Sequence, residues 1–284
     1  MRRALLLGIL LVSAGVATRA QEGATPPEKE KSKDAGATGG LTEEEFKALH
    51  DLTDKAPPAP KGTMIDLAGA RAYLSLPEGK PPFPAVVVIH EWWGLNGHIQ
   101  HWTDRLAADG YAALAVDLYG GRVATTPDSA MAYMRAVDDA RAVAIMRAAH
   151  DYLRTNTRIR AARTGSIGWC FGGGMSLKLA LAEPELDAAV IYYGRLVTDP
   201  EELAAIKASV LGIFGNKDES IPPAVVNDFE AALTTAKVPH EIRRYDADHA
   251  FANPSAASYD QKNAGAAWSE VEKFLAAHLL GGGK

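Results

Sequence analysis

Short apolar runs alternate with longer segments of helical character from residue 62 to the C-terminus. One run, "AVVVI" at 85–89, is apolar at every position, so both faces of the strand that it predicts must be covered. Such β-branched runs are typical of parallel strands packed between helices. Repeated strand–helix alternation requires right-handed crossovers. We therefore predict an α/β fold with an open, mostly parallel sheet and helices on both faces.

The pattern predicts seven strands and a helix between most of them. We expect strands at 70–77, 81–90, 111–120, 164–169, 187–193, 209–215 and 240–246. We expect helices at 98–109, at 125–154 in two pieces, and at 173–183, 200–207, 222–236 and 258–280, with Thr126 as an N-cap before Pro127. Sheets of this kind bind ligands beyond the carboxyl ends of their strands, so the residues after each strand are the candidates for function.

The first 20 residues, "MRRALLLGILLVSAGVATRA", precede the fold. Two arginines, an apolar stretch and small residues up to Ala20 predict a secretory signal peptide cleaved after Ala20. The apolar run is short and broken by glycine for a membrane span, although an uncleaved anchor is the alternative. We expect a periplasmic or secreted protein, a monomer or weak dimer, with no stable membrane association after cleavage.

Residues 21–61 are predicted to link this signal to a single α/β domain at 62–284. Residues 21–40 are charged and rich in proline and glycine, as in a disordered tether. A short helix follows, with Thr42 and Glu45 spaced as a capping box. The net charge of −5 gives no reason to expect nucleic acid or an anionic membrane as a partner. The single cysteine excludes an intrachain disulfide and a multi-cysteine metal cluster.

That cysteine, Cys170, lies between a predicted strand and a predicted helix, in the pattern G-x-C-x-G. The serine version of this pattern is the nucleophile elbow of α/β-hydrolases. Glycines at 168 and 172 would relieve collisions in so sharp a turn. The following helix would favour the thiolate, and the Phe171 N–H would bind an oxyanion. The alternative is a buried structural cysteine beside glycines that pack a helix.

A base and an acid follow the later strands in the order nucleophile, acid, histidine. Asp218 comes after the strand at 209–215, and His249 after the strand at 240–246, so both lie on the side of Cys170. His240 precedes its strand and falls at the opposite edge of the sheet. The other candidates are the histidines His50 and His278 and the acids Glu219, Asp246 and Asp248.

The loop after the strand at 81–90 reads "HEWWGLNGHIQH". Its Glu91 and Trp92 lie where the second oxyanion N–H of this architecture arises. The zinc-binding pattern HExxH fails, because Gly94 occupies the place of its second histidine. His98 and His101 alone are weak ligands, so we predict no metal site.

The motifs "HEWWGLN", "GWCFGGG", "NKD" followed by "IP", and "DHAF" together resemble the dienelactone hydrolase family of α/β-hydrolases over residues 62–280. The resemblance implies hydrolysis of enol lactones and other esters, with carboxymethylenebutenolidase as the named activity and no cofactor. It implies a triad in which Cys170 is the nucleophile, His249 the base and then the acid, and Asp218 the residue that orients His249.

Glu91 matches the glutamate of the family that pairs with the resting thiol and assists its ionisation, although it could simply be hydrogen-bonded in its loop. Such gating would also protect a free thiol from oxidants. Members of the family hold the substrate carboxylate with arginines, and this chain departs from that pattern. Asn253 stands where one arginine is expected, Arg122 of "DLYGGR" matches the other, and Arg195 would have to compensate for the missing one. Aromatic side chains at the strand ends are predicted to line a pocket, namely Trp92, Trp93, Trp169, Tyr119, Tyr193 and Phe251.

The predicted reaction is therefore hydrolysis of a small-molecule ester or lactone through a thioester on Cys170. The alternative from another class is a secreted, non-enzymatic binding protein that keeps the fold and a ligand pocket. A thiol-redox protein is a weaker alternative, because there is no second cysteine. The acyl group that Cys170 would accept, and whether Asn253 abolishes use of dienelactone, are not specified by the sequence.

Overall fold

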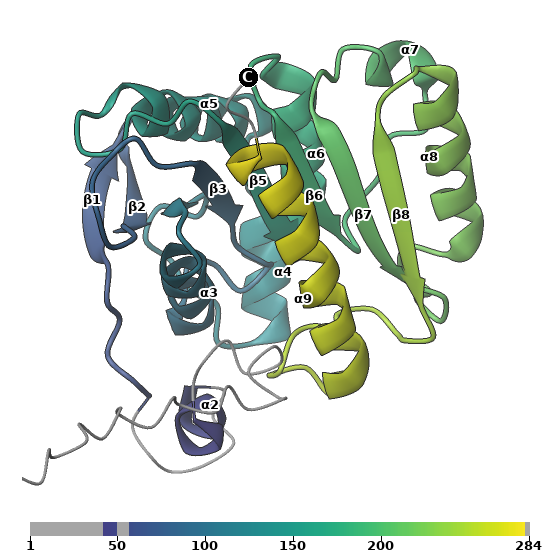
Figure 1. The fold of residues 1–284 in the computed structure, drawn as a ribbon. Helices are drawn as coiled ribbons and strands as arrows, with labels where there is room; N and C mark the ends of the chain where they lie inside the picture. The colour runs from purple at the N-terminus through teal and green to yellow at the C-terminus, as the bar shows by residue number, and fades with distance from the viewer. Residues whose placement is uncertain (1–41, 50–56, 282–284) are drawn as a thin grey trace, which may run out of the picture. The chain divides into compact units, whose positions relative to one another are not determined.

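A computed structural model of the chain describes residues 42–49 and 57–281 (Figure 1). The predicted signal peptide and tether lie outside these residues. The short helix predicted before the domain is α2 (Glu43–Leu49). Its capping box is confirmed by two hydrogen bonds. The Glu45 N–H donates to Thr42 Oγ1 at 3.2 Å, and a Glu45 carboxylate oxygen accepts the Thr42 N–H at 2.9 Å. Within the described ranges, no helix is long and apolar enough to cross a bilayer.

Eight strands form one sheet in the order β1-β2-β4-β3-β5-β6-β7-β8. β1 and β2 pair antiparallel, β2 pairs antiparallel with β4, and every neighbouring pair from β4 to β8 is parallel. The mostly parallel sheet predicted from the sequence is thus confirmed. The strands are β1 (Thr63–Leu67), β2 (Ala70–Ser75), β3 (Ala85–Ile89), β4 (Ala112–Val116), β5 (Thr164–Trp169), β6 (Ala188–Tyr192), β7 (Ser209–Gly215) and β8 (His240–Tyr245).

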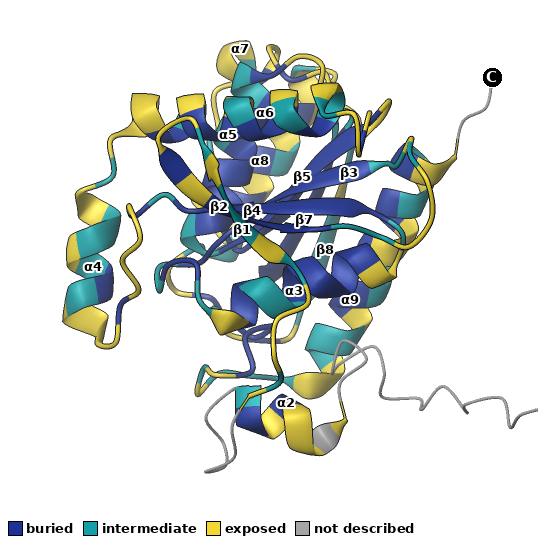
Figure 2. Ribbon diagram, turned by 90° about the vertical axis from the view of Figure 1, so that its left-hand side faces the viewer, coloured by how far each residue is buried: buried dark blue, intermediate teal, exposed yellow. Residues whose placement is uncertain are grey.

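Helices cover both faces of this sheet, and two apolar clusters fill the layers (Figure 2). One face packs against α3 (Gly97–Ala108) and α9 (Gln261–Leu275), which a π-helical turn extends from Ala276 to Leu280. The other face packs against α5 (Asp139–Thr155), α6 (Phe171–Ala182) and α8 (Pro223–Thr235). β3 and β4 are buried at every position, as their continuous apolar runs predict.

The remaining helices are α4 (Pro127–Arg135) and α7 (Pro200–Leu203). α4 and α5 are the two pieces predicted between 125 and 154. Thr126 caps α4 as predicted, because its Oγ1 accepts the Ser129 N–H at 3.2 Å.

The sequence prediction missed β1 and misplaced four boundaries by three residues or more. β3 begins at Ala85 rather than 81, and α7 ends at Leu203 rather than 207. β1 joins β2 through a tight turn in which Ala68 and Gly69 both have positive φ, 50° and 72°. The predicted strand at 111–120 ends at Val116, because the loop after it is held by the Asp117 carboxylate, which accepts the Tyr119 N–H at 2.8 Å. The last helix starts at residue 261 rather than 258, since Asp260 is its N-cap.

Candidate active site

Cys170 lies at the turn between β5 and the N-terminus of α6, at the carboxyl edge of the sheet. Its backbone is strained, with φ 54° and ψ −115°, a region that few non-glycine residues adopt. A Cβ on Gly168 would come within 2.1 Å of the Gly172 carbonyl oxygen, and one on Gly172 within 2.3 Å of the Ile89 oxygen. The predicted need for glycine at both positions is confirmed, because the turn closes only without side chains there.

Two backbone N–H groups near this turn are available to a ligand. Phe171 is the first residue of α6, where the amides have no partner within the helix. Trp92 lies in the loop after β3, which the elbow approaches closely at Gly172. In the part of the chain that the structure describes, neither N–H donates a hydrogen bond to another residue.

His249 and Asp218 are joined by a hydrogen bond of 2.7 Å between Nδ1 and a carboxylate oxygen. The other oxygen of the fully buried Asp218 side chain accepts the N–H groups of Ser220 and Ile221, both at 2.8 Å. Burial opposes ionisation of Asp218, but these bonds and the His249 charge hold its pKa below the ordinary 3.8. Asp218 is therefore a fixed carboxylate that sets the orientation and tautomer of His249.

The His249 ring also interacts with the Cys170 side chain. Burial alone would lower the pKa of His249, but the bonds to Asp218 and Cys170 and their charges raise it well above the ordinary 6.5. The three side chains that the sequence singles out thus form one continuous chain of contacts, from Cys170 through His249 to Asp218.

Glu91 lies beside this group and is 4% exposed. Its carboxylate accepts a hydrogen bond of 2.5 Å from the Asn253 side-chain amide. Burial raises the pKa of Glu91 to about 7, although the charge of His249 and the bond from Asn253 oppose the rise. No hydrogen bond joins Glu91 to Cys170 among the described residues, so its predicted role in ionising the thiol stays a prediction.

Comparison with known proteins gives the same assignment as the motifs. The model of the dienelactone hydrolase family matches residues 70–279, which is most of the chain. The chain belongs to the dienelactone hydrolase family. A relative from Synechocystis, provisionally named a carboxymethylenebutenolidase, is 32% identical over 233 residues, which cover 76% of this chain and 93% of the relative. A similar relative from Saccharolobus solfataricus, with the same provisional name, is 32% identical over 74% of this chain and 95% of its own length.

Solved structures agree with this assignment. A dienelactone hydrolase-like promiscuous phosphotriesterase from metagenomic libraries superposes with a TM-score of 0.71 and 26% identity, covering 77% of this chain and 98% of its own. A provisional dienelactone hydrolase from Klebsiella pneumoniae gives a TM-score of 0.67 and 30% identity over 76% of this chain and 97% of its own. The predicted α/β-hydrolase fold is confirmed.

Two tyrosines of this dienelactone hydrolase-like site lie close to the nucleophile. The Tyr119 ring lies 5.6 Å from that of Phe171, and its buried hydroxyl has no hydrogen-bond partner among the residues that the structure describes. Burial, together with the charge of Cys170, raises the pKa of Tyr119. Tyr193, fully buried, packs edge-on against His249 with ring centroids 5.1 Å apart.

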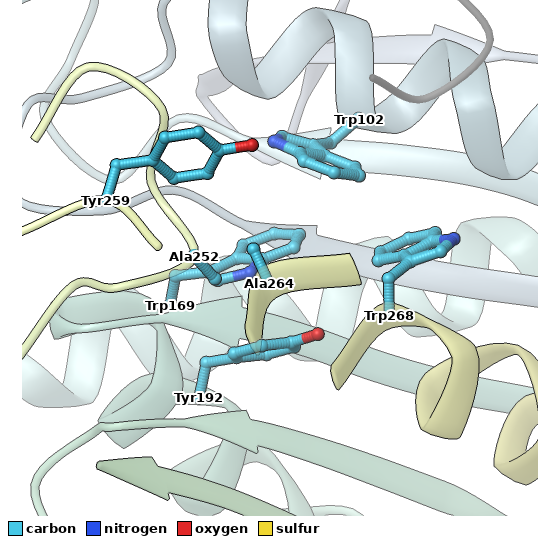
Figure 3. Close-up of a pocket in the computed structure, with 7 residues that line it drawn as sticks. All are labelled: Trp102, Trp169, Tyr192, Ala252, Tyr259, Ala264 and Trp268. Atoms are coloured by element: carbon cyan, nitrogen blue, oxygen red, sulfur yellow. The ribbon is translucent and has the colours of Figure 1, made fainter. Parts of the chain in front are cut away.

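The other aromatic side chains predicted to line a pocket divide between loop and core. Trp92 and Trp93 contact each other in the loop after β3, with ring centroids 5.0 Å apart, and both are partly exposed. Phe251 has no exposed surface and packs between Tyr193 and Tyr245. Trp169 is also buried, in an aromatic cluster with Trp102, Tyr192 and Trp268 that lines a small cavity (Figure 3).

The two candidate arginines are both exposed. The Arg122 Nε donates to the Tyr119 carbonyl oxygen at 2.9 Å, and its guanidinium lies 4.3 Å above the Tyr133 ring. These contacts hold Arg122 at the rim of the loop after β4. Arg195 lies in the turn after β6, where its backbone approaches the glycines of α6.

Sequence reasoning did not identify two residues of this site. Asn253 was recognised as a departure from the family, but its hydrogen bond to Glu91 was not predicted. His90 was not singled out, although a histidine at the end of an otherwise apolar buried strand is an unusual choice and is a usable signal.

Proposed function

We propose that this protein hydrolyses carboxylic esters or lactones through a thioester on Cys170. The observation that carries the proposal is the chain of contacts from the strained Cys170 through His249 to the buried Asp218 carboxylate. A structural cysteine would need neither the strained turn nor a histidine held in this way. Membership of the dienelactone hydrolase family supports the same reaction class.

In the first half of the reaction, the Cys170 thiolate attacks the carbonyl carbon and a C–S bond forms. The electron pair of the carbonyl moves to its oxygen, which the N–H groups of Phe171 and Trp92 would bind. When this intermediate collapses, the C–O bond to the leaving group breaks, and the His249 imidazolium donates its proton to that oxygen. For a lactone the leaving oxygen stays attached to the acyl group.

In the second half, water attacks the thioester while the neutral His249 accepts its proton. The second tetrahedral intermediate collapses by breaking the C–S bond, which releases the carboxylic acid and restores the thiolate–imidazolium pair. Asp218 remains ionised throughout and stabilises the protonated His249. We also propose that these steps occur outside the cytoplasm, on the basis of the signal-like segment at 1–20.

The direct test compares wild type, Cys170→Ala and the remote control His240→Ala on p-nitrophenyl acetate and on dienelactone. His240 is the first residue of β8, at the amino edge of the sheet and away from Cys170, so its loss should leave turnover unchanged. Cys170→Ala should abolish hydrolysis of both substrates. Because one relative is named a phosphotriesterase, paraoxon belongs in the same panel. Hydrolysis that survives in Cys170→Ala would refute the proposal, and ligand binding without hydrolysis by the wild type would favour the binding-protein alternative.

A further inference from the structure

The imidazole of His90 connects three segments of the chain near Cys170. His90 directly follows β3 and is fully buried. Its ring stacks on that of Phe171, with centroids 5.7 Å apart, and meets Tyr119 edge-on at 4.6 Å. Phe171 is the first residue of α6, and Tyr119 belongs to the loop after β4. The His90 ring therefore contacts the loop after β4 and both segments that carry a proposed oxyanion donor.

Both ring nitrogens of His90 bind backbone groups, and together they fix its tautomer. Nε2 lies 3.2 Å from the Leu118 nitrogen, whose N–H can only donate, so Nε2 carries no proton. The proton is therefore on Nδ1, which lies 2.6 Å from the Glu91 carbonyl oxygen and donates to it. Burial lowers the pKa of His90, in keeping with a neutral ring.

The bond to the Glu91 carbonyl acts on the Trp92 N–H, because the two belong to one peptide group. In a planar trans peptide, the carbonyl and the following N–H point in opposite directions. The same Glu91 oxygen also accepts the Gly94 N–H at 3.3 Å. Two donors therefore fix the plane of the 91–92 peptide and direct the Trp92 N–H away from His90. Bonds to the carbonyl also polarise the peptide and strengthen its N–H as a donor.

We propose that His90 is a positioning residue of the oxyanion hole, which orients the Trp92 N–H through the Glu91 carbonyl and supports Phe171 by stacking. It takes no part in proton transfer. The inference rests on the proposed function, since an oxyanion forms only if Cys170 attacks a carbonyl group.

The test compares His90→Ala, His90→Gln and the control His240→Gln. A Gln amide carries a donor and an acceptor about as far apart as the two imidazole nitrogens, so it can keep both backbone bonds. Loss of one oxyanion donor typically costs about 10²–10³-fold in kcat. Because His90 only orients such a donor, we expect His90→Ala to lower kcat on p-nitrophenyl acetate at least about tenfold with KM nearly unchanged. His90→Gln should recover most of the loss, and His240→Gln should match wild type.

Two probes separate positioning from a general structural effect. Alkylation of Cys170 by iodoacetamide needs the thiolate but forms no oxyanion, so its rate should stay within about twofold in all variants. An alkyl trifluoromethyl ketone accepts the thiolate at its carbonyl carbon and becomes a stable tetrahedral oxyanion, so its inhibition constant should rise in His90→Ala by the factor lost in kcat.

The ketone is assayed by competition with iodoacetamide, so it reports on the oxyanion hole even if wild type hydrolyses no ester. A wild type that hydrolyses no ester would refute the proposed function but not the role of His90. An unchanged affinity for the ketone in His90→Ala would overturn the inference, and so would equal losses in His90→Ala and His90→Gln. Slower alkylation of Cys170 by iodoacetamide in His90→Ala, by the factor lost in kcat, would also overturn the inference. It would show that the whole turn around Cys170 had moved.

Discussion

Replacement of Glu91 by Gln should change how the stability of the protein depends on pH. Gln has the shape of a protonated Glu, can still accept the Asn253 hydrogen bond, and does not titrate. Burial raises the pKa of Glu91 from its ordinary 4.5 to about 7, so between these values the folded state binds more protons than the unfolded state. Stability of the wild type is therefore lost as pH rises through this window. At about 1.4 kcal/mol per pH unit, the loss is roughly 3 kcal/mol.

The assay is urea denaturation of wild type and Glu91→Gln at several pH values from 4.5 to 8. Other groups titrate in both proteins, so the difference between the two unfolding free energies isolates Glu91. We expect this difference to move by roughly 3 kcal/mol in favour of Glu91→Gln as pH rises, and to level off above pH 7. A difference that stays constant with pH would refute the reasoning, since it would mean that Glu91 ionises in the fold as easily as in water.

Three further substitutions test the site. Asp218→Asn keeps the shape of the side chain but loses the charge behind His249, so hydrolysis of p-nitrophenyl acetate should fall by roughly 10³–10⁴-fold while near-ultraviolet circular dichroism is unchanged. Asn253→Ala leaves the Glu91 carboxylate without its partner, which should destabilise the protein by about 1–3 kcal/mol in urea at pH 8 and raise the pKa of Glu91 further. Gly172→Ala would place a methyl group 2.3 Å from the Ile89 oxygen, so it should lower the free energy of unfolding by about 3 kcal/mol or more, measured by thermal melting. The control Gly69→Ala has open space around the methyl group but φ 72°, so it should lower the free energy of unfolding by only about 1–2 kcal/mol.

The parts of the fold that the sequence predicts are those that depend on local patterns. β5 and β7 have the predicted boundaries, because each is a short apolar run between clear breaks. The cap of α4 follows from Thr126 and Pro127 alone. β1 was missed because it is an edge strand without a buried face, and its turn uses Ala68–Gly69 instead of the commoner Asn-Gly or Asp-Gly.

The candidate site divides in the same way. Cys170, Asp218 and His249 can be placed from strand order, because the carboxyl ends of parallel strands share one edge of the sheet. The contact between Asn253 and Glu91 joins positions 162 residues apart and depends on side-chain packing. The two backbone bonds of His90 depend on how closely the loops after β3 and β4 approach. Neither has a local pattern from which it could be read.

The central claim is that Cys170 carries the acyl group, and intact-protein mass spectrometry tests it most directly. Wild type, Cys170→Ala and His249→Ala are mixed with p-nitrophenyl acetate and quenched in acid within milliseconds to seconds. We predict that wild type gains one acetyl group on the peptide containing Cys170, that hydroxylamine at neutral pH removes it as a thioester, and that Cys170→Ala gains none. An acetyl group found on another residue while hydrolysis proceeds, or equal labelling of Cys170→Ala, would contradict the account.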